Sequence, residues 1–176
     1  RDPRVDYAKI ELLKNAVGSV PWTLSGLGHF LSGFAMVYLA LGARAIFHNY
    51  KLVPTRVAML AAVIGSIGFM MTGISDLIGG GLFGLPNGAV QLMVAQNPDL
   101  ERPAYLAMSL GRIVFNCLAQ VGLGWYAVLV SWCGRRTGVL PRWFCYVGYA
   151  SGFMGLVQGV VFFPFYLQFV LIWSLL

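Results

Sequence analysis

The chain has 176 residues, of which 59% are hydrophobic and only 10% are charged, and its mean hydropathy is +0.76. A soluble domain of this length cannot bury so much apolar surface, because too many of its positions face water. The composition therefore excludes a soluble globular domain and predicts an integral membrane protein. The net charge of +6 requires no nucleic-acid partner, since basic residues gathered at the edges of a bilayer account for it.

The N-terminal segment mixes apolar and charged residues over Val5–Val17, which is typical of an amphipathic helix at the membrane interface. We expect residues 1–21 to form this interfacial segment and residues 22–176 to form a single transmembrane helical domain. The chain opens on Arg1 and ends inside an apolar run, so we also expect it to be the ordered part of a longer polypeptide.

A helix that spans a bilayer needs roughly 20 mostly apolar residues. Runs of that kind occupy Trp22–Phe47, Val57–Gly80, Ala104–Trp132 and Trp143–Phe163. The shorter run Phe165–Leu176 follows Pro164, which favours a turn there and the start of another helix. The expected fold is an all-α membrane bundle of four transmembrane helices, with a fifth that would be cut short at the C-terminus.

The long connection at residues 81–103 is rich in Gly, Pro and Asn but also carries many apolar side chains. Loops in water are rarely so apolar. We therefore expect this connection to pack back onto the bundle or to dip into the headgroup region. The run Asn97–Pro98–Asp99 is a turn signal before the third span.

Basic residues near helix ends predict the orientation of the chain in the membrane. The short connections 44–56 and 134–142 each carry three of them, whereas the long connection has only Arg102, beside two acidic residues. We predict that both short connections face the cytoplasm of a bacterial inner membrane, with the N-terminal segment and the long connection outside. Four basic residues within the N-terminal segment argue against this orientation.

Charged residues interrupt two of the spans, Asp76 in the second and Arg112 in the third. An ion buried in a bilayer is unfavourable unless it finds a partner or water, so we expect these two to meet. Arg112, Asn116 and Gln120 recur every four residues, which places them on one face of a helix. Counting turns in antiparallel helices brings further polar residues to the same depth. The sequence thus predicts one buried polar cluster: His29, Asp76, Arg112, Asn116, Gln120 and Gln158.

This cluster has two interpretations. Interhelical hydrogen bonds contribute only about 0.6 kcal/mol on average, and a cluster of this kind can simply fix which helices touch. Alternatively, ionisable groups inside a membrane bind ligands or handle protons.

The two histidines, His29 and His48, lie on one predicted helix about five turns apart. Axial haem ligands come from facing helices at similar depth, so a bis-histidine haem is excluded within this chain. We expect bound lipids and no cofactor, with ligation of a haem or chlorophyll by His29 alone as the alternative. The three cysteines, Cys117, Cys133 and Cys145, lack metal-ligand spacing.

The usual catalytic motifs are missing: the sequence contains no Gly-x-Ser-x-Gly, His-Glu-x-x-His, P-loop or paired-carboxylate pattern. Of the six acidic residues, only Asp76 lies inside a predicted span. We expect no enzymatic activity.

A basic turn, Thr137–Trp143, joins the last two spans and contains Gly, Leu, Pro and Arg before the tryptophan. It resembles the final hairpin of a group of small bacterial multi-pass membrane proteins catalogued as a domain of unknown function. The resemblance loosely covers the last three spans. It implies a multi-helix membrane fold and no particular chemistry.

The absence of catalytic motifs favours a protein that works by binding others. We expect an accessory or scaffolding subunit of a larger complex, whose partners are the lipid bilayer and other membrane-protein subunits. The alternative is a small transport or ligand-binding protein built on Asp76, Arg112 and His29. An enzyme acting on a lipid or a quinone is the third hypothesis.

Overall fold

The computed structural model describes residues 16–50, 53–80 and 88–175, with side chains up to Val160. Its elements in chain order are α2 (Val20–Phe47), η1 (His48–Tyr50), α3 (Val53–Gly80), α4 (Ala89–Gln96), η2 (Pro98–Leu100), α5 (Glu101–Thr137) and α6 (Arg142–Leu175). No strand occurs in these ranges, so the predicted all-α class is confirmed for them. Most of the predicted interfacial segment, residues 1–15, lies outside the described residues.

Three segments are long and apolar enough to cross a membrane: Val20–Tyr50, Val53–Gly79 and Pro98–Thr137. They correspond to the first three predicted spans and indicate a membrane protein. The fourth predicted span, Trp143–Phe163, lies in α6, whose side chains are described only in part. It therefore stays a prediction.

The prediction of a turn at Pro164 and a fifth helix after it is wrong. The helix α6 runs without a break from Arg142 to Leu175. A proline removes one backbone hydrogen bond from a helix. In an apolar environment, however, a turn would leave more backbone groups without partners than a continuous helix does.

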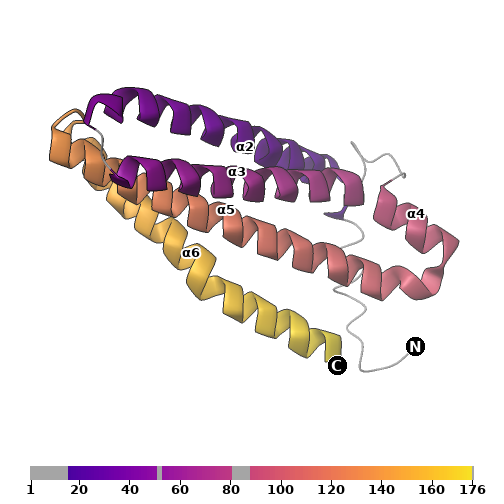
Figure 1. Ribbon diagram of the computed structural model, residues 1–176. Coiled ribbons are helices and arrows are strands. Elements are labelled where there is room, and N and C mark those ends of the chain that lie inside the picture. Colours follow the sequence, from indigo (N-terminus) through magenta and orange to yellow (C-terminus); the bar gives the residue numbers. More distant parts are fainter. Residues whose placement is uncertain (1–15, 51–52, 81–87, 176) are drawn as a thin grey trace.

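The four long helices lie side by side in a row that follows their order in the chain (Figure 1). The helix α3 packs between α2 and α5, and α5 packs between α3 and α6, whereas α2 and α5 barely touch. Within the described residues the helices therefore form an open layer, and no common core encloses all four. There, each of the outer helices α2 and α6 packs extensively against one long helix.

Small residues hold neighbouring helices close together in this row. A Cβ atom added at Gly122 of α5 would collide with the backbone of Gly65 in α3. On the other side of α5, a Cβ at Gly124 would lie 2.7 Å from the carbonyl oxygen of Gly152 in α6. Backbones approach this closely only where side chains are small, which is the usual way for helices to associate in lipid.

The predicted loop at residues 81–103 is partly helical and packs back onto the end of the row. It contains α4 and η2, and α5 begins at Glu101, earlier than expected. Val90 and Val94 of α4 pack against Tyr105 and Met108 of α5. Of the two expected arrangements, packing onto the bundle is the one found for residues 88–103. Residues 81–87 lie outside the described part.

The short connections lie at the opposite end of the row from α4 (Figure 1). Here Thr55 Oγ1 approaches Cys133 Sγ to 3.7 Å, which joins α3 to α5. The helix α5 ends where Gly138 adopts a left-handed conformation with φ of 71°. That conformation suits glycine because it has no Cβ. The tight turn that follows starts α6 beside α5.

Candidate functional site

An ion pair between α3 and α5 forms the centre of the candidate site. Arg112 Nε lies 3.1 Å from Asp76 Oδ1, so the expected contact is present. The side chain of Asp76 is fully buried, whereas that of Arg112 is 34% exposed. Asp76 sits near the C-terminal end of α3, where α5 enters the row in the opposite direction. The antiparallel arrangement therefore brings the two charges to the same depth.

His29 reaches the same carboxylate from α2. Its Nδ1 lies 3.8 Å from Asp76 Oδ2 and 3.5 Å from Ser25 Oγ. Its ring stacks on Phe69 of α3 with a centroid distance of 6.2 Å. These neighbours fix the orientation of the imidazole and place Asp76 between a histidine and an arginine. A role for His29 as a cofactor ligand stays a hypothesis.

Trp22 belongs to this site, and sequence reasoning missed it. Its Nε1 donates a hydrogen bond of 3.0 Å to the carbonyl oxygen of Asp76. Arg112 Cζ lies 4.4 Å from the centre of its ring, a cation–π geometry. A tryptophan at the start of a span is usually an interface anchor. The helical spacing of Trp22 could have indicated its place in the site, because Trp22, Ser25 and His29 fall on one face of α2.

Two buried acceptor groups are incompletely satisfied. Neither carboxylate oxygen of Asp76 receives a hydrogen bond of good geometry within the described residues, although Arg112 is close enough for an ion pair. The side-chain oxygen of Asn116 is also buried without such a bond there. Leaving a buried acceptor unpaired costs about 1–3 kcal/mol. The site therefore has hydrogen-bonding capacity that these residues do not use among themselves.

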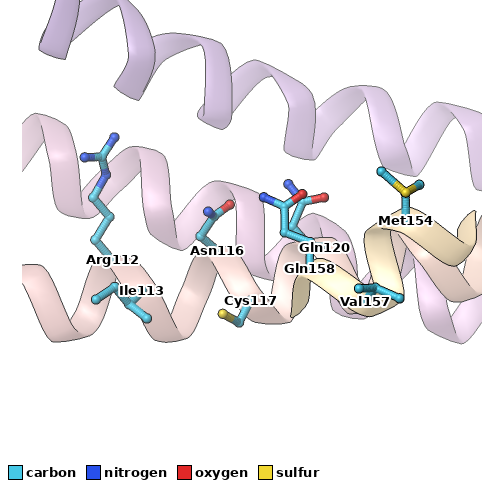
Figure 2. A pocket seen from close by; sticks show the side chains of 8 residues that line it. All are labelled: Arg112, Ile113, Asn116, Cys117, Gln120, Met154, Val157 and Gln158. Atoms are coloured by element: carbon cyan, nitrogen blue, oxygen red, sulfur yellow. The ribbon is translucent and has the colours of Figure 1, made fainter. Parts of the chain in front are cut away.

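A cavity of about 550 Å³ lies between α5 and α6, next to the ion pair. Figure 2 shows Asn116 and Gln120 of α5 and Gln158 of α6 projecting in the same general direction, with Ile113 and Cys117 on the other side of α5. We call it the α5–α6 cavity. Its lining residues are Arg112, Ile113, Asn116, Cys117, Gln120, Met154, Val157 and Gln158.

The cavity is open on the side of α6. Met154 is 69% exposed, and Gln158 is also exposed. The prediction that Gln158 belongs to a buried cluster is therefore wrong. Among the described residues, α5 is the one long helix that packs on α6, and most side chains of residues 142–160 are exposed or only partly buried. The position of Gln158 in the sequence predicts its depth along the helix row, but it does not predict how many helices surround it.

The six predicted site residues fall into two adjacent groups that share Arg112. His29 and Asp76 form the ion-pair group with Arg112 and Trp22. Asn116, Gln120 and Gln158 line the α5–α6 cavity with Arg112. The arginine connects a charged cluster to a cavity that contains three amides. This arrangement can bind a molecule through hydrogen bonds.

No group of three or more His, Cys, Asp or Glu side chains is placed to hold a metal ion in the described part of the chain. The three cysteines carry free thiols, Cys117 at the cavity and the buried Cys133 and Cys145 towards the other end. Comparison of the chain with protein-family models, with curated proteins and with solved structures gives no match.

Proposed function

We propose that this protein is a non-catalytic, multi-pass membrane protein that binds a small neutral, amphipathic molecule in the α5–α6 cavity. The observation that carries this proposal is the set of three amide side chains around a cavity of about 550 Å³. Pockets for small molecules typically measure about 300–1,000 Å³. Lipid tails cannot hydrogen-bond amides, so a polar cavity at membrane depth needs water or a ligand to satisfy it.

The charges around the cavity favour a neutral ligand. Among the described residues that line it, Arg112 carries the only charge, and its Nε lies 3.1 Å from Asp76 Oδ1. The pair therefore brings little net charge to the site. The amides of Asn116, Gln120 and Gln158 both donate and accept hydrogen bonds. A ligand with hydroxyl, carbonyl or amide groups fits these side chains, and Ile113 and Val157 would contact its apolar part.

Filling the cavity is expected to expel this ligand. In the Val157→Trp variant the indole occupies the cavity, so small molecules that copurify with the wild-type protein should be lost. Val160 provides a matched control on the same helix, because it is 59% exposed and does not line the cavity. Purification in mild detergent, extraction with organic solvent and mass spectrometry measure the molecules that remain bound.

The proposal requires one neutral molecule to be present near stoichiometry in the wild type and in Val160→Trp, and to be depleted in Val157→Trp. Equal loss in both variants would indicate a general effect of tryptophan on α6 and would contradict the cavity. Finding no small molecule in any of the three proteins would also contradict it.

An accessory subunit of a membrane complex is the second candidate. The observation that favours it is the exposed amide of Gln158, which a neighbouring membrane protein would satisfy as well as a ligand would. Native mass spectrometry of the same preparations separates the two. A stoichiometric protein partner that survives in Val157→Trp supports the second candidate, whereas a monomer that carries a small molecule supports the first.

The proposal also includes α6 as a fourth span, with the connections 44–56 and 134–142 in the cytoplasm. Asn97 and Val139 are exposed residues at opposite ends of the row. In a background without native cysteines, Asn97→Cys should react with an impermeant thiol reagent added outside intact cells. Val139→Cys should react only after permeabilisation. The reverse pattern would invert the orientation, and labelling of both from outside would contradict a crossing of the membrane by α5, which lies between the two positions.

A further inference from the structure

A second polar cavity lies at the opposite end of the row from α4. It measures about 520 Å³ and is lined by Trp132, Arg135, Arg136 and Tyr149. We call it the arginine pocket. The two arginines come from the last turn of α5, and Tyr149 comes from α6. Because α5 and α6 are joined by a tight turn, the pocket sits near the end of α5 and the start of α6.

Aromatic rings hold the two guanidinium groups in place. Arg136 Cζ lies 5.0 Å from the centre of the Trp132 ring, and Arg135 Cζ lies 5.2 Å from that of Tyr146. A guanidinium held by its face against a ring keeps the N–H groups at its edge available. Those edge donors match the geometry of phosphate oxygens, which arginine binds with two parallel hydrogen bonds.

No carboxylate among the described residues neutralises these arginines. The acidic residues there are Asp76, Asp99 and Glu101. Glu101 begins α5, which has 37 residues and is therefore about 55 Å long. Charges interact weakly beyond about 8 Å at physiological ionic strength. Arg44, Arg56 and Arg142 lie at the same end as the pocket, so this end of the protein is strongly positive.

We infer that the arginine pocket binds the phosphate of an anionic phospholipid headgroup. The ends of spanning helices lie at the level of the headgroups, and basic pockets between transmembrane helices at that level bind anionic headgroups. The acyl chains would extend along the exposed apolar residues of α6, which include Val147, at 58% exposure. This site is separate from the α5–α6 cavity; it rests on the proposed fourth span but not on the ligand proposed for that cavity.

Lipid titration of the purified full chain tests this inference. Phosphatidylglycerol and phosphatidylcholine with identical acyl chains are added in detergent, and native mass spectrometry measures the affinity for the first bound lipid. Wild type should prefer phosphatidylglycerol. Arg135→Gln/Arg136→Gln should weaken that lipid by about 10- to 30-fold and leave phosphatidylcholine unchanged. Arg56→Gln/Arg142→Gln removes the same charge from the same end but outside the pocket, and should stay close to wild type.

Several outcomes would overturn the inference. Equal weakening in both double variants would mean that net charge alone attracts the lipid, and equal affinity of wild type for the two lipids would mean that no headgroup site exists. Displacement of phosphatidylglycerol by inorganic phosphate would assign the pocket to the free anion. If the glutamine variant does not fold, Arg135→Lys/Arg136→Lys serves instead. Loss of affinity there supports the pocket, because lysine cannot donate two parallel bonds, and unchanged affinity contradicts it.

Discussion

Replacing Arg112 by leucine is expected to destabilise the protein by about 3–5 kcal/mol, because it leaves the carboxylate of Asp76 buried without its ion-pair partner. Asp76→Leu should destabilise the protein less than Arg112→Leu does. The arginine that remains is 34% exposed and still stacks on Trp22, so it retains contact with water and with an aromatic ring. The double variant Asp76→Leu/Arg112→Leu should recover much of the stability, since it removes both charges together.

Unfolding in SDS followed by circular dichroism measures these changes, with exposed Asp99→Asn as a control that should not alter stability. Silent single variants would mean that the pair contributes nothing to folding. Additive losses in the double variant would mean that the two residues act independently. Ligand retention in the double variant is a separate measurement. If the ligand is retained, Arg112 supports the fold alone; if it is lost, Arg112 also contributes to binding in the α5–α6 cavity.

The Gly122→Ala variant adds one methyl group, which is expected to lower the free energy of unfolding by about 1–3 kcal/mol through overpacking. The new Cβ would collide with the backbone of Gly65 and would lie 2.7 Å from the carbonyl oxygen of Ala61. Backbone atoms of a packed helix cannot rotate away as a flexible side chain can. The Gly122→Ala variant can therefore accommodate its methyl group only by moving α5 away from α3.

Gly28→Ala is the matched control, because a Cβ at that position meets nothing within 4 Å. It should be neutral or slightly stabilising, since alanine is a better helix former than glycine. The same SDS unfolding measurement compares the two. Equal effects at both positions would show that the close approach of α3 and α5 does not contribute to stability.

Composition and hydrophobic run length were enough to predict the all-α class and the positions of the first three spans. The reason is that the bilayer imposes one requirement on every spanning segment, a long apolar helix whose backbone hydrogen bonds are satisfied within it. The same regularity predicted the depth of Asp76 and Arg112, and their contact follows from depth together with the cost of an unpaired charge. Helical spacing likewise predicted the stripe of Arg112, Asn116 and Gln120.

Lateral arrangement could not be predicted in this way. Nothing in the periodicity of α6 shows that α5 is its one long helical neighbour among the described residues, and that arrangement exposes Gln158 and opens the cavity beside it. Trp22 entered the ion-pair group because α2 and α5 approach at one end, although its position in sequence is typical of an interface anchor. Depth is a property of each helix separately, whereas neighbours depend on where glycines such as Gly65, Gly122 and Gly152 allow two backbones to meet. The sequence by itself therefore determined which residues share a level in the membrane, and only the tertiary structure decided which of them touch, because close packing depends on the shapes of two helices at once.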